Sequence, residues 1–337
     1  MIPDFRPHPL LLTGHLQTLA GLRHKPMKEA ARQHRVTLVD GDQIVLHDDC
    51  PNEWKSGHRT ALMIHGLAGC HASPYMQRIA RKLNVCGVRT FRMDLRGCGA
   101  GVGLARLPYH SGRSEDAVEA LKKIDELCPG SPTTLIGFSL GGNIALKLLG
   151  EFPSRLPAHL DRALAVCPPV DLRKCVQSLK QGLNRFYDRI FVQLLMDQIQ
   201  VQLRLLPGAP ARELRRPRGV LEFDESFTAP VCGFGTAANY YERSSSAQFV
   251  PDIRVPTLIL AAGDDPLIPG QVFDELCLSS AVSLHLARSG GHLGFIGRRN
   301  GDPDRRWMDW RVVEWCVGDR SPVAPVSADH PRSSSGT

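Results

Sequence analysis

The stretch LIGFSLGGNIALKLLG, from Leu135 to Gly150, places a serine between glycines where an apolar run turns into a helical pattern. Gly137, Ser139 and Gly141 form the pattern G-x-S-x-G. In a nucleophile elbow the serine takes a strained conformation on a tight strand-to-helix turn, and the positions two before and two after it must lack bulk. The stretch therefore predicts a nucleophilic serine at position 139. The alternative is a packing turn with a helix-capping serine.

Short apolar segments typical of buried parallel strands alternate along the chain with helical patterns. The expected strands are residues 60–65, 88–94, 132–138, 161–167, 256–263 and 282–288, and the helical patterns are residues 73–87, 114–128, 141–152 and 305–318. Repeated strand–helix units predict an α/β protein with a mostly parallel central sheet and helices on both faces. Residues 34–50 predict a hairpin that adds antiparallel strands at one edge.

The alternation is interrupted between about residues 170 and 229. Helical spacing relates Leu183, Phe186, Tyr187, Ile190, Leu194 and Leu195, and a connector rich in proline and arginine follows. We expect a long amphipathic helix that packs on the sheet domain or caps a substrate pocket. The expected organisation is one domain over residues 1–318, with a helical cap insertion at about 170–229. Proline, serine and charge dominate residues 319–337, which predicts a disordered tail.

Composition excludes several classes of protein. The chain has 337 residues, 42% of them hydrophobic, and no apolar run suits a membrane span or a signal peptide. We therefore expect a cytoplasmic protein that contacts membranes peripherally at most. Ten cysteines are scattered without a CxxC pair, which indicates reduced thiols. The net charge of +7 is carried by dispersed arginines without interleaved aromatics, so we expect solvated surface and no nucleic-acid partner.

A serine hydroxyl needs a base and an acid to become a nucleophile, and in this arrangement they should follow it in the order Asp, His. The segment AAGDDPLIPG follows the strand at 256–263 and offers Asp264 and Asp265. The segment SGGHLGFIG follows the strand at 282–288 and offers His292. Both segments lie just past strand ends, where such sheets place their chemistry.

Ester hydrolysis also needs hydrogen-bond donors for the oxyanion. The position after the nucleophile supplies the N–H of Leu140, and the segment HGLAG at 65–69 supplies the N–H of Leu67. Neighbouring His65, Cys70 and His71 suggest zinc, but no acid or further ligand follows at a metal-site spacing. We therefore expect no metal and no cofactor.

Eight segments together resemble the YheT-like branch of the α/β-hydrolase superfamily, which also contains animal abhydrolase-domain lipases and phospholipases. They are GHLQTL, HGLAGCHASPYM, DLRGCGAG, YHSG, GFSLGGN, APVCGFGTAANYY, DDPLIP and GGHLGF. The resemblance runs from about residue 5 to 315. It implies the α/β-hydrolase fold and a triad of Ser139, Asp265 and His292. It also implies activity on carboxylic esters, from short- or medium-chain acyl esters to lipid-like ones.

The choice between the two adjacent acids rests on spacing. Asp265 is followed four residues later by Pro269, and this D-x-x-x-P spacing resembles the acid loop of many α/β-hydrolases. We therefore expect Asp265 to orient His292 and Asp264 to accept hydrogen bonds from loop N–H groups. Two other functions stay open, because fold does not fix function. One is a non-catalytic binding module, and the other is an acyltransferase that uses the same triad.

Overall fold

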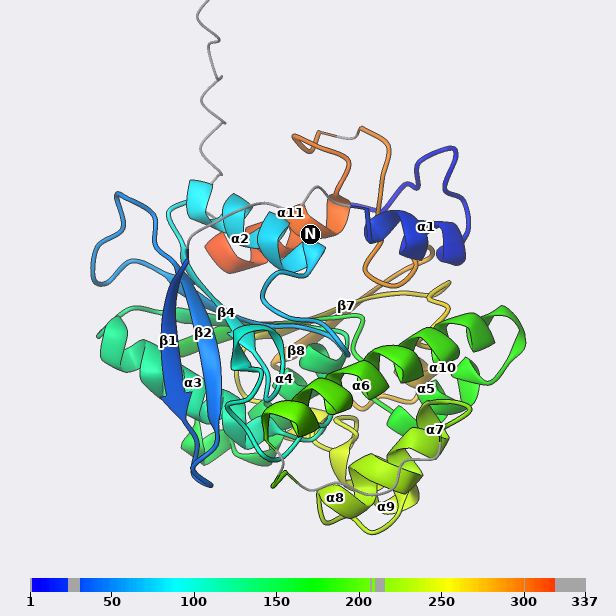
Figure 1. Cartoon of the computed structure of the whole chain (residues 1–337). Helices are drawn as coiled ribbons and strands as arrows, with labels where there is room; N and C mark the ends of the chain where they lie inside the picture. The colour runs from blue at the N-terminus through cyan, green and yellow to red at the C-terminus, as the bar shows by residue number, and fades with distance from the viewer. Residues whose placement is uncertain (1, 24–30, 207, 210–215, 300, 319–337) are drawn as a thin grey trace, which may run out of the picture.

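The computed structural model describes residues 2–23, 31–206, 208–209, 216–299 and 301–318. Within these residues an eight-stranded sheet has the order β1-β2-β4-β3-β5-β6-β7-β8 (Figure 1). The strands are β1 (Arg32–Thr37), β2 (Gln43–Asp49), β3 (Thr60–Ile64), β4 (Arg89–Asp94), β5 (Thr133–Phe138), β6 (Leu160–Val166), β7 (Thr257–Ala262) and β8 (Val282–Ala287). The pairs β1–β2 and β2–β4 are antiparallel and the others are parallel. The predicted parallel sheet and its edge hairpin are confirmed.

Helices cover both faces of the sheet, because alternate strand residues point to opposite faces. In β3, Leu62 and Ile64 join one core with α3 (Ser114–Leu127) and α4 (Leu140–Glu151). Ala61 and Met63 join a second core with α2 (Pro74–Val85) and α11 (Trp307–Val317). Figure 1 shows these two layers on opposite sides of the sheet. The predicted α/β architecture is therefore confirmed.

The remaining helical segments include the cap, which lies between β6 and β7. They are α1 (Gly14–Gly21), α5 (Leu172–Leu179), α6 (Arg185–Leu205), α7 (Val220–Phe223), the π-helix η4 (Asp224–Thr228), α8 (Ala229–Val231), α9 (Ala237–Ser244) and α10 (Gln271–Asp274). Short 3-10 turns occur at η1 (Gly99–Gly101), η2 (Pro153–Arg155), η3 (Gly182–Asn184) and η5 (Val250–Asp252). The insertion extends past the expected boundary at residue 229, because α9 packs on α5 and α8. The expected tail at 319–337 lies outside the described residues.

The apolar residues of the long cap helix α6 lie on two faces and not on the single stripe that we expected. Tyr187 and Leu195 are buried. The outward side chains are Leu183 in the preceding turn η3 and Phe186, Ile190 and Leu194 in α6, which are 74%, 58%, 39% and 42% exposed. Residues follow one another at about 100° around a helix, so the spacing of the predicted stripe spans two faces. One face therefore packs inward and the other is apolar but exposed.

Candidate active site

The elbow around Ser139 lies between the central strand β5 and α4. Ser139 has φ 51° and ψ −120°, a left-handed φ that is strained for a residue with a side chain. Its N–H donates to the carbonyl of Val166 at 2.8 Å. A Cβ atom on Gly137 would overlap the carbonyl of Gly141, and one on Gly141 would overlap the carbonyl of Ile64. The two glycines therefore allow the turn to close.

Asp265 and His292 come from the loops after β7 and β8. Asp265 Oδ2 lies 2.8 Å from His292 Nδ1, and Asp265 Oδ1 accepts hydrogen bonds from the N–H groups of Leu267 and Ile268 at 2.8 and 3.1 Å. The neighbouring Asp264 instead accepts the N–H of Gly291 at 2.9 Å. The adjacent acids therefore make separate contacts, one to the imidazole and one to the loop backbone.

Ser139 shares a cavity with residues of the loop that carries Asp265. Ser139, Leu267 and Ile268 line one cavity. No hydrogen bond links Ser139 Oγ to His292 in the described parts of the chain. Hydrogen bonds between catalytic groups are often long without substrate and tighten when it binds. The structure thus brings Asp265 and His292 into contact and places Ser139 on a cavity that the residues after Asp265 also line.

The two expected oxyanion donors are free to bind a ligand. Within the described residues, the N–H groups of Leu67 and Leu140 donate no hydrogen bond. The flanking N–H groups in the first loop are occupied, that of Gly66 by Tyr75 Oη at 2.8 Å and that of Ala68 by Tyr109 Oη at 2.9 Å. Burial raises the pKa of Tyr75 to about 12, so its hydroxyl stays neutral. Two tyrosines therefore hold the loop on either side of Leu67.

A buried cluster anchors the same loop to the sheet. Asp94, at the end of β4, accepts the backbone N–H of His71 at 2.6 Å, and its Oδ2 lies 2.8 Å from His71 Nδ1 and 2.9 Å from His47 Nε2. Burial opposes the charge, but hydrogen bonds from both histidines keep the pKa of Asp94 well below its usual range. A charged carboxylate thus fixes the loop that carries Leu67.

This cluster bears on the zinc interpretation of His65, Cys70 and His71. Folding groups His71 with His47 and Asp94 instead. The rings of His47 and His71 are stacked, with centroids 3.4 Å and planes 10° apart. A metal ion about 2.0–2.1 Å from each nitrogen must lie near both ring planes, which stacked rings do not permit. The geometry fits a hydrogen-bonded anchor. Spacing along the chain could not reveal it, because separate strands bring its members together.

Sequence reasoning also missed two residues that lie against the hydrogen-bonded pair of Asp265 and His292. Thr18 Oγ1, on α1, accepts the backbone N–H of His292 at 2.9 Å. The thiol of Cys167 lies near the facing atoms of Asp265 and His292, all within 4.8 Å of one another. Burial, together with the nearby Asp265 charge, raises the pKa of Cys167 well above its usual value, so the thiol is neutral. Nothing in the local sequence marks Thr18 or Cys167 as neighbours of the site.

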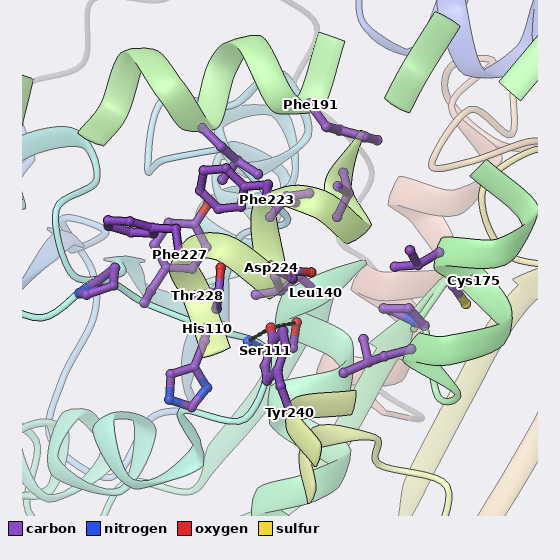
Figure 2. Close-up of a pocket in the computed structure, with 18 of the residues that line it drawn as sticks. His110, Ser111, Leu140, Cys175, Phe191, Phe223, Asp224, Phe227, Thr228 and Tyr240 are labelled. Carbon is purple, nitrogen blue, oxygen red and sulfur yellow. Dashed lines mark hydrogen bonds between the residues drawn. The ribbon is translucent and has the colours of Figure 1, made fainter. Parts of the chain in front are cut away.

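The cavity beside Ser139 has an empty volume of about 1030 Å³, part of it open to solvent. Its cap wall is mainly apolar, with Phe191 from α6, Phe223 from α7 and Phe227 from η4 (Figure 2). Leu140 from α4 belongs to the opposite, sheet-domain wall. A mainly apolar cavity with a few polar groups is typical of a small-molecule site.

Comparisons with known proteins agree with this architecture. A family model described as alpha/beta hydrolase fold matches residues 62–298. The putative esterase YheT of Escherichia coli is 33% identical over 309 residues, which cover 90% of each chain. Monoacylglycerol lipase of Saccharomyces cerevisiae is 29% identical over 257 residues, covering 73% of this chain and 56% of the lipase. The solved structure of the Pyrococcus furiosus esterase Pf2001 has a TM-score of 0.54 at 16% identity, covering 94% of this chain and 98% of its own, and shows a likeness of fold alone.

Proposed function

This chain belongs to the α/β-hydrolase superfamily, in its YheT-like branch, and we propose that, as a carboxylic ester hydrolase, it cleaves its substrates through an acyl-enzyme formed on Ser139. The observation that carries this mechanism is the hydrogen-bonded pair of Asp265 and His292 beside an elbow serine. The relatives named as esterase and lipase support the reaction class.

The proposed first step is attack of Ser139 Oγ on the ester carbonyl. Asp265 accepts a hydrogen bond from Nδ1–H of His292 and so keeps that proton on Nδ1, which leaves Nε2 as the base that takes the serine proton. The N–H groups of Leu67 and Leu140 stabilise the oxyanion of the tetrahedral intermediate. His292 then gives the proton to the leaving alkoxide, and the alcohol departs. A water molecule, deprotonated by the same imidazole, releases the acid and restores Ser139.

The three candidate functions differ in what happens to an activated ester. A hydrolase acting on p-nitrophenyl esters releases p-nitrophenol and the free acid in equal amounts. An acyltransferase supplied with a primary alcohol yields mainly the new ester, and a binding module releases nothing above background. We expect the hydrolase result, and chromatography of the acyl products distinguishes the three. A new ester as the main product in dilute alcohol would contradict it.

The acyl chain is proposed to lie against the cap wall of the cavity. Replacing Phe191 with alanine removes a ring from that wall and enlarges the cavity. We therefore expect the acyl chain of the preferred p-nitrophenyl ester to become longer by about one or two carbons. Pocket contacts discriminate by about 1–3 kcal/mol per methylene. The matched control is Phe186→Ala on the same helix, because Phe186 is 58% exposed and does not line the cavity. An unchanged preference in Phe191→Ala, with a large fall in melting temperature, would assign Phe191 to the core.

We also propose a peripheral contact with lipid. No helix in the described ranges has the length and apolarity to cross a membrane. Most of the exposed large apolar side chains belong to two segments, namely Leu10, Leu12, Leu16, Leu19 and Leu22 around α1 and Leu183, Phe186, Ile190, Leu194, Val201 and Leu205 around α6. The segments meet where His15 Nδ1 lies 3.1 Å from Tyr187 Oη. Arg185, Arg189 and Arg204 are exposed along α6 and favour an anionic surface.

Vesicle sedimentation tests this contact. We expect binding to vesicles that contain anionic lipid, and we expect Phe186→Ser to weaken it by about tenfold, because one large apolar side chain contributes about 1.5–3 kcal/mol on burial. Val39→Ser is the control, since Val39 is 91% exposed in the β1–β2 turn, outside this surface. Equal loss in both variants would contradict a contact centred on α6.

A further inference from the structure

Most buried aspartates in the described residues are paired with an arginine, lysine or histidine side chain. Eight aspartates are buried in the described part of the chain. Six pair with arginine, lysine or histidine, namely Asp42, Asp48, Asp94, Asp116, Asp265 and Asp309. The seventh, Asp188, accepts the backbone N–H of Val220 at 2.8 Å. The eighth, Asp224, has neither a cationic partner nor a backbone donor among the described residues.

The side chains that hydrogen-bond to Asp224 are neutral hydroxyls. Tyr241 Oη donates to Asp224 Oδ2 at 2.7 Å, and the hydroxyl of Thr228 is a second stabilising neighbour. The titratable groups electrostatically coupled to this carboxyl are Asp188, Tyr109, Tyr240, Tyr241 and Cys232. Burial raises the pKa of Asp224 to about 6. At neutral pH the group is therefore mostly a carboxylate in an apolar setting without a counter-ion.

Asp224 is also part of the cavity beside Ser139. It is 7% exposed and lines the wall on the cap side, where η4 is a π-helix, a form that often occurs at functional sites. Figure 2 shows it among the side chains of Phe223, Phe227 and Leu140. Arg96 lines the same cavity, but its guanidinium is held by Asp40, Asp42 and Asp116, so its charge is offset.

Four aromatic rings line the same cavity as the Asp224 carboxylate. The cavity wall holds two pairs, Phe223 with Phe227 at a centroid distance of 5.6 Å and Tyr240 with Tyr241 at 5.2 Å. Aromatic faces attract cations, and they suit an ammonium group whose charge is spread over methyl groups. We call Asp224 and these four rings the Asp224 subsite. A carboxylate combined with aromatic rings is complementary to a cationic nitrogen rather than to an alkyl chain.

We propose that the Asp224 subsite binds a cationic nitrogen of the substrate, so that the enzyme favours esters that carry an ammonium group, above all a quaternary one. This inference rests on the proposed ester hydrolysis at Ser139 and adds the substrate class. A bound cation acts as the counter-ion that the Asp224 carboxylate otherwise lacks. An uncharged chain in the same place leaves the carboxylate unpaired in an apolar cavity, which costs binding energy.

The sharpest test compares two esters of the same shape. A choline ester and the corresponding 3,3-dimethylbutyl ester differ in one atom, because a neutral carbon replaces the ammonium nitrogen. We expect the wild-type enzyme to have a kcat/KM for the choline ester at least about tenfold higher. In Asp224→Asn the ratio should fall to within about twofold of one, because the variant carries no charge that distinguishes the two esters. Asp188→Asn is the matched control, since Asp188 is a buried cap aspartate outside the cavity lining, and it should keep the preference.

The pH dependence of this ratio tests the same inference without a variant. Asp224 is charged above its pKa of about 6, so the preference for the cationic ester should be full near pH 8 and fall toward pH 5. Any effect of pH on the chemical step that the two esters share cancels in the ratio. Equal kcat/KM values for the two esters in the wild type, or a preference that survives in Asp224→Asn, would overturn the subsite.

Failure of the proposed hydrolysis gives a different result. In that case the protein hydrolyses neither of the two esters nor any p-nitrophenyl ester. Binding of choline, measured by calorimetry, then replaces the kinetic assay. Choline should then bind more tightly than 3,3-dimethylbutan-1-ol, and Asp224→Asn should remove the difference. Equal binding of the two alcohols by the wild-type protein would overturn the subsite independently of catalysis.

Discussion

The Ser139→Ala variant is expected to lose covalent labelling by a fluorophosphonate together with ester hydrolysis. Removal of a triad member lowers the rate by about 10⁴-fold or more, because no other group supplies the nucleophile. The change should leave the fold intact, since alanine is smaller than serine and Ser139 Oγ makes no hydrogen bond within the described residues. Mass spectrometry of the labelled wild-type peptide and matched kcat/KM values measure the effect.

Ser111→Ala is the control for this experiment. Ser111 lines the same cavity, but its Oγ already accepts the hydroxyl of Tyr240 at 2.9 Å, and it does not follow a tight strand-to-helix turn. This variant should keep both labelling and turnover. Label on a peptide without Ser139, or activity that survives in Ser139→Ala, would show that the nucleophile lies elsewhere.

The sequence could predict the features of this molecule that depend on neighbouring residues. The apolar segments bounded by glycine, proline or charge became strands, and the spacing of Gly137 and Gly141 around Ser139 marked the elbow because a turn of that kind has no room for larger side chains. The loops after β7 and β8 were expected to meet, since the ends of neighbouring parallel strands lie at the same edge of a sheet.

Features that depend on three-dimensional packing were not predictable in the same way. Spacing alone could not tell which face of α6 packs inward. In the structure Phe186 is exposed, whereas Phe191 lines the cavity. The anchor of His47, His71 and Asp94 joins two strands and a loop. Asp224 has no cationic partner among the described residues, and no local sequence motif predicts this absence.

A second experiment distinguishes the roles of the two adjacent acids, Asp264 and Asp265. Asp265→Asn is expected to lower kcat by about 10³ to 10⁴-fold while the protein stays folded. Asp265 Oδ2 accepts a hydrogen bond from His292 Nδ1, 2.8 Å away, whereas an asparagine NH₂ placed there donates and favours the tautomer with its proton on Nε2. That tautomer cannot take the proton of Ser139. The loop should persist, because the asparagine carbonyl can still accept the N–H groups of Leu267 and Ile268.

Asp264→Asn is the matched comparison, because the same chemical change falls one residue earlier. Asp264 Oδ1 accepts the N–H of Gly291 at 2.9 Å, one residue before His292, and burial raises the pKa of Asp264. An amide oxygen can replace that acceptor, so we expect kcat near the wild-type value and a loss of stability of about 1 kcal/mol or less. Steady-state kcat and thermal unfolding of both variants decide the assignment. A catalytic collapse in Asp264→Asn beside near-normal Asp265→Asn would reverse it, since the carboxylate that touches the imidazole would then not be the one that orients it.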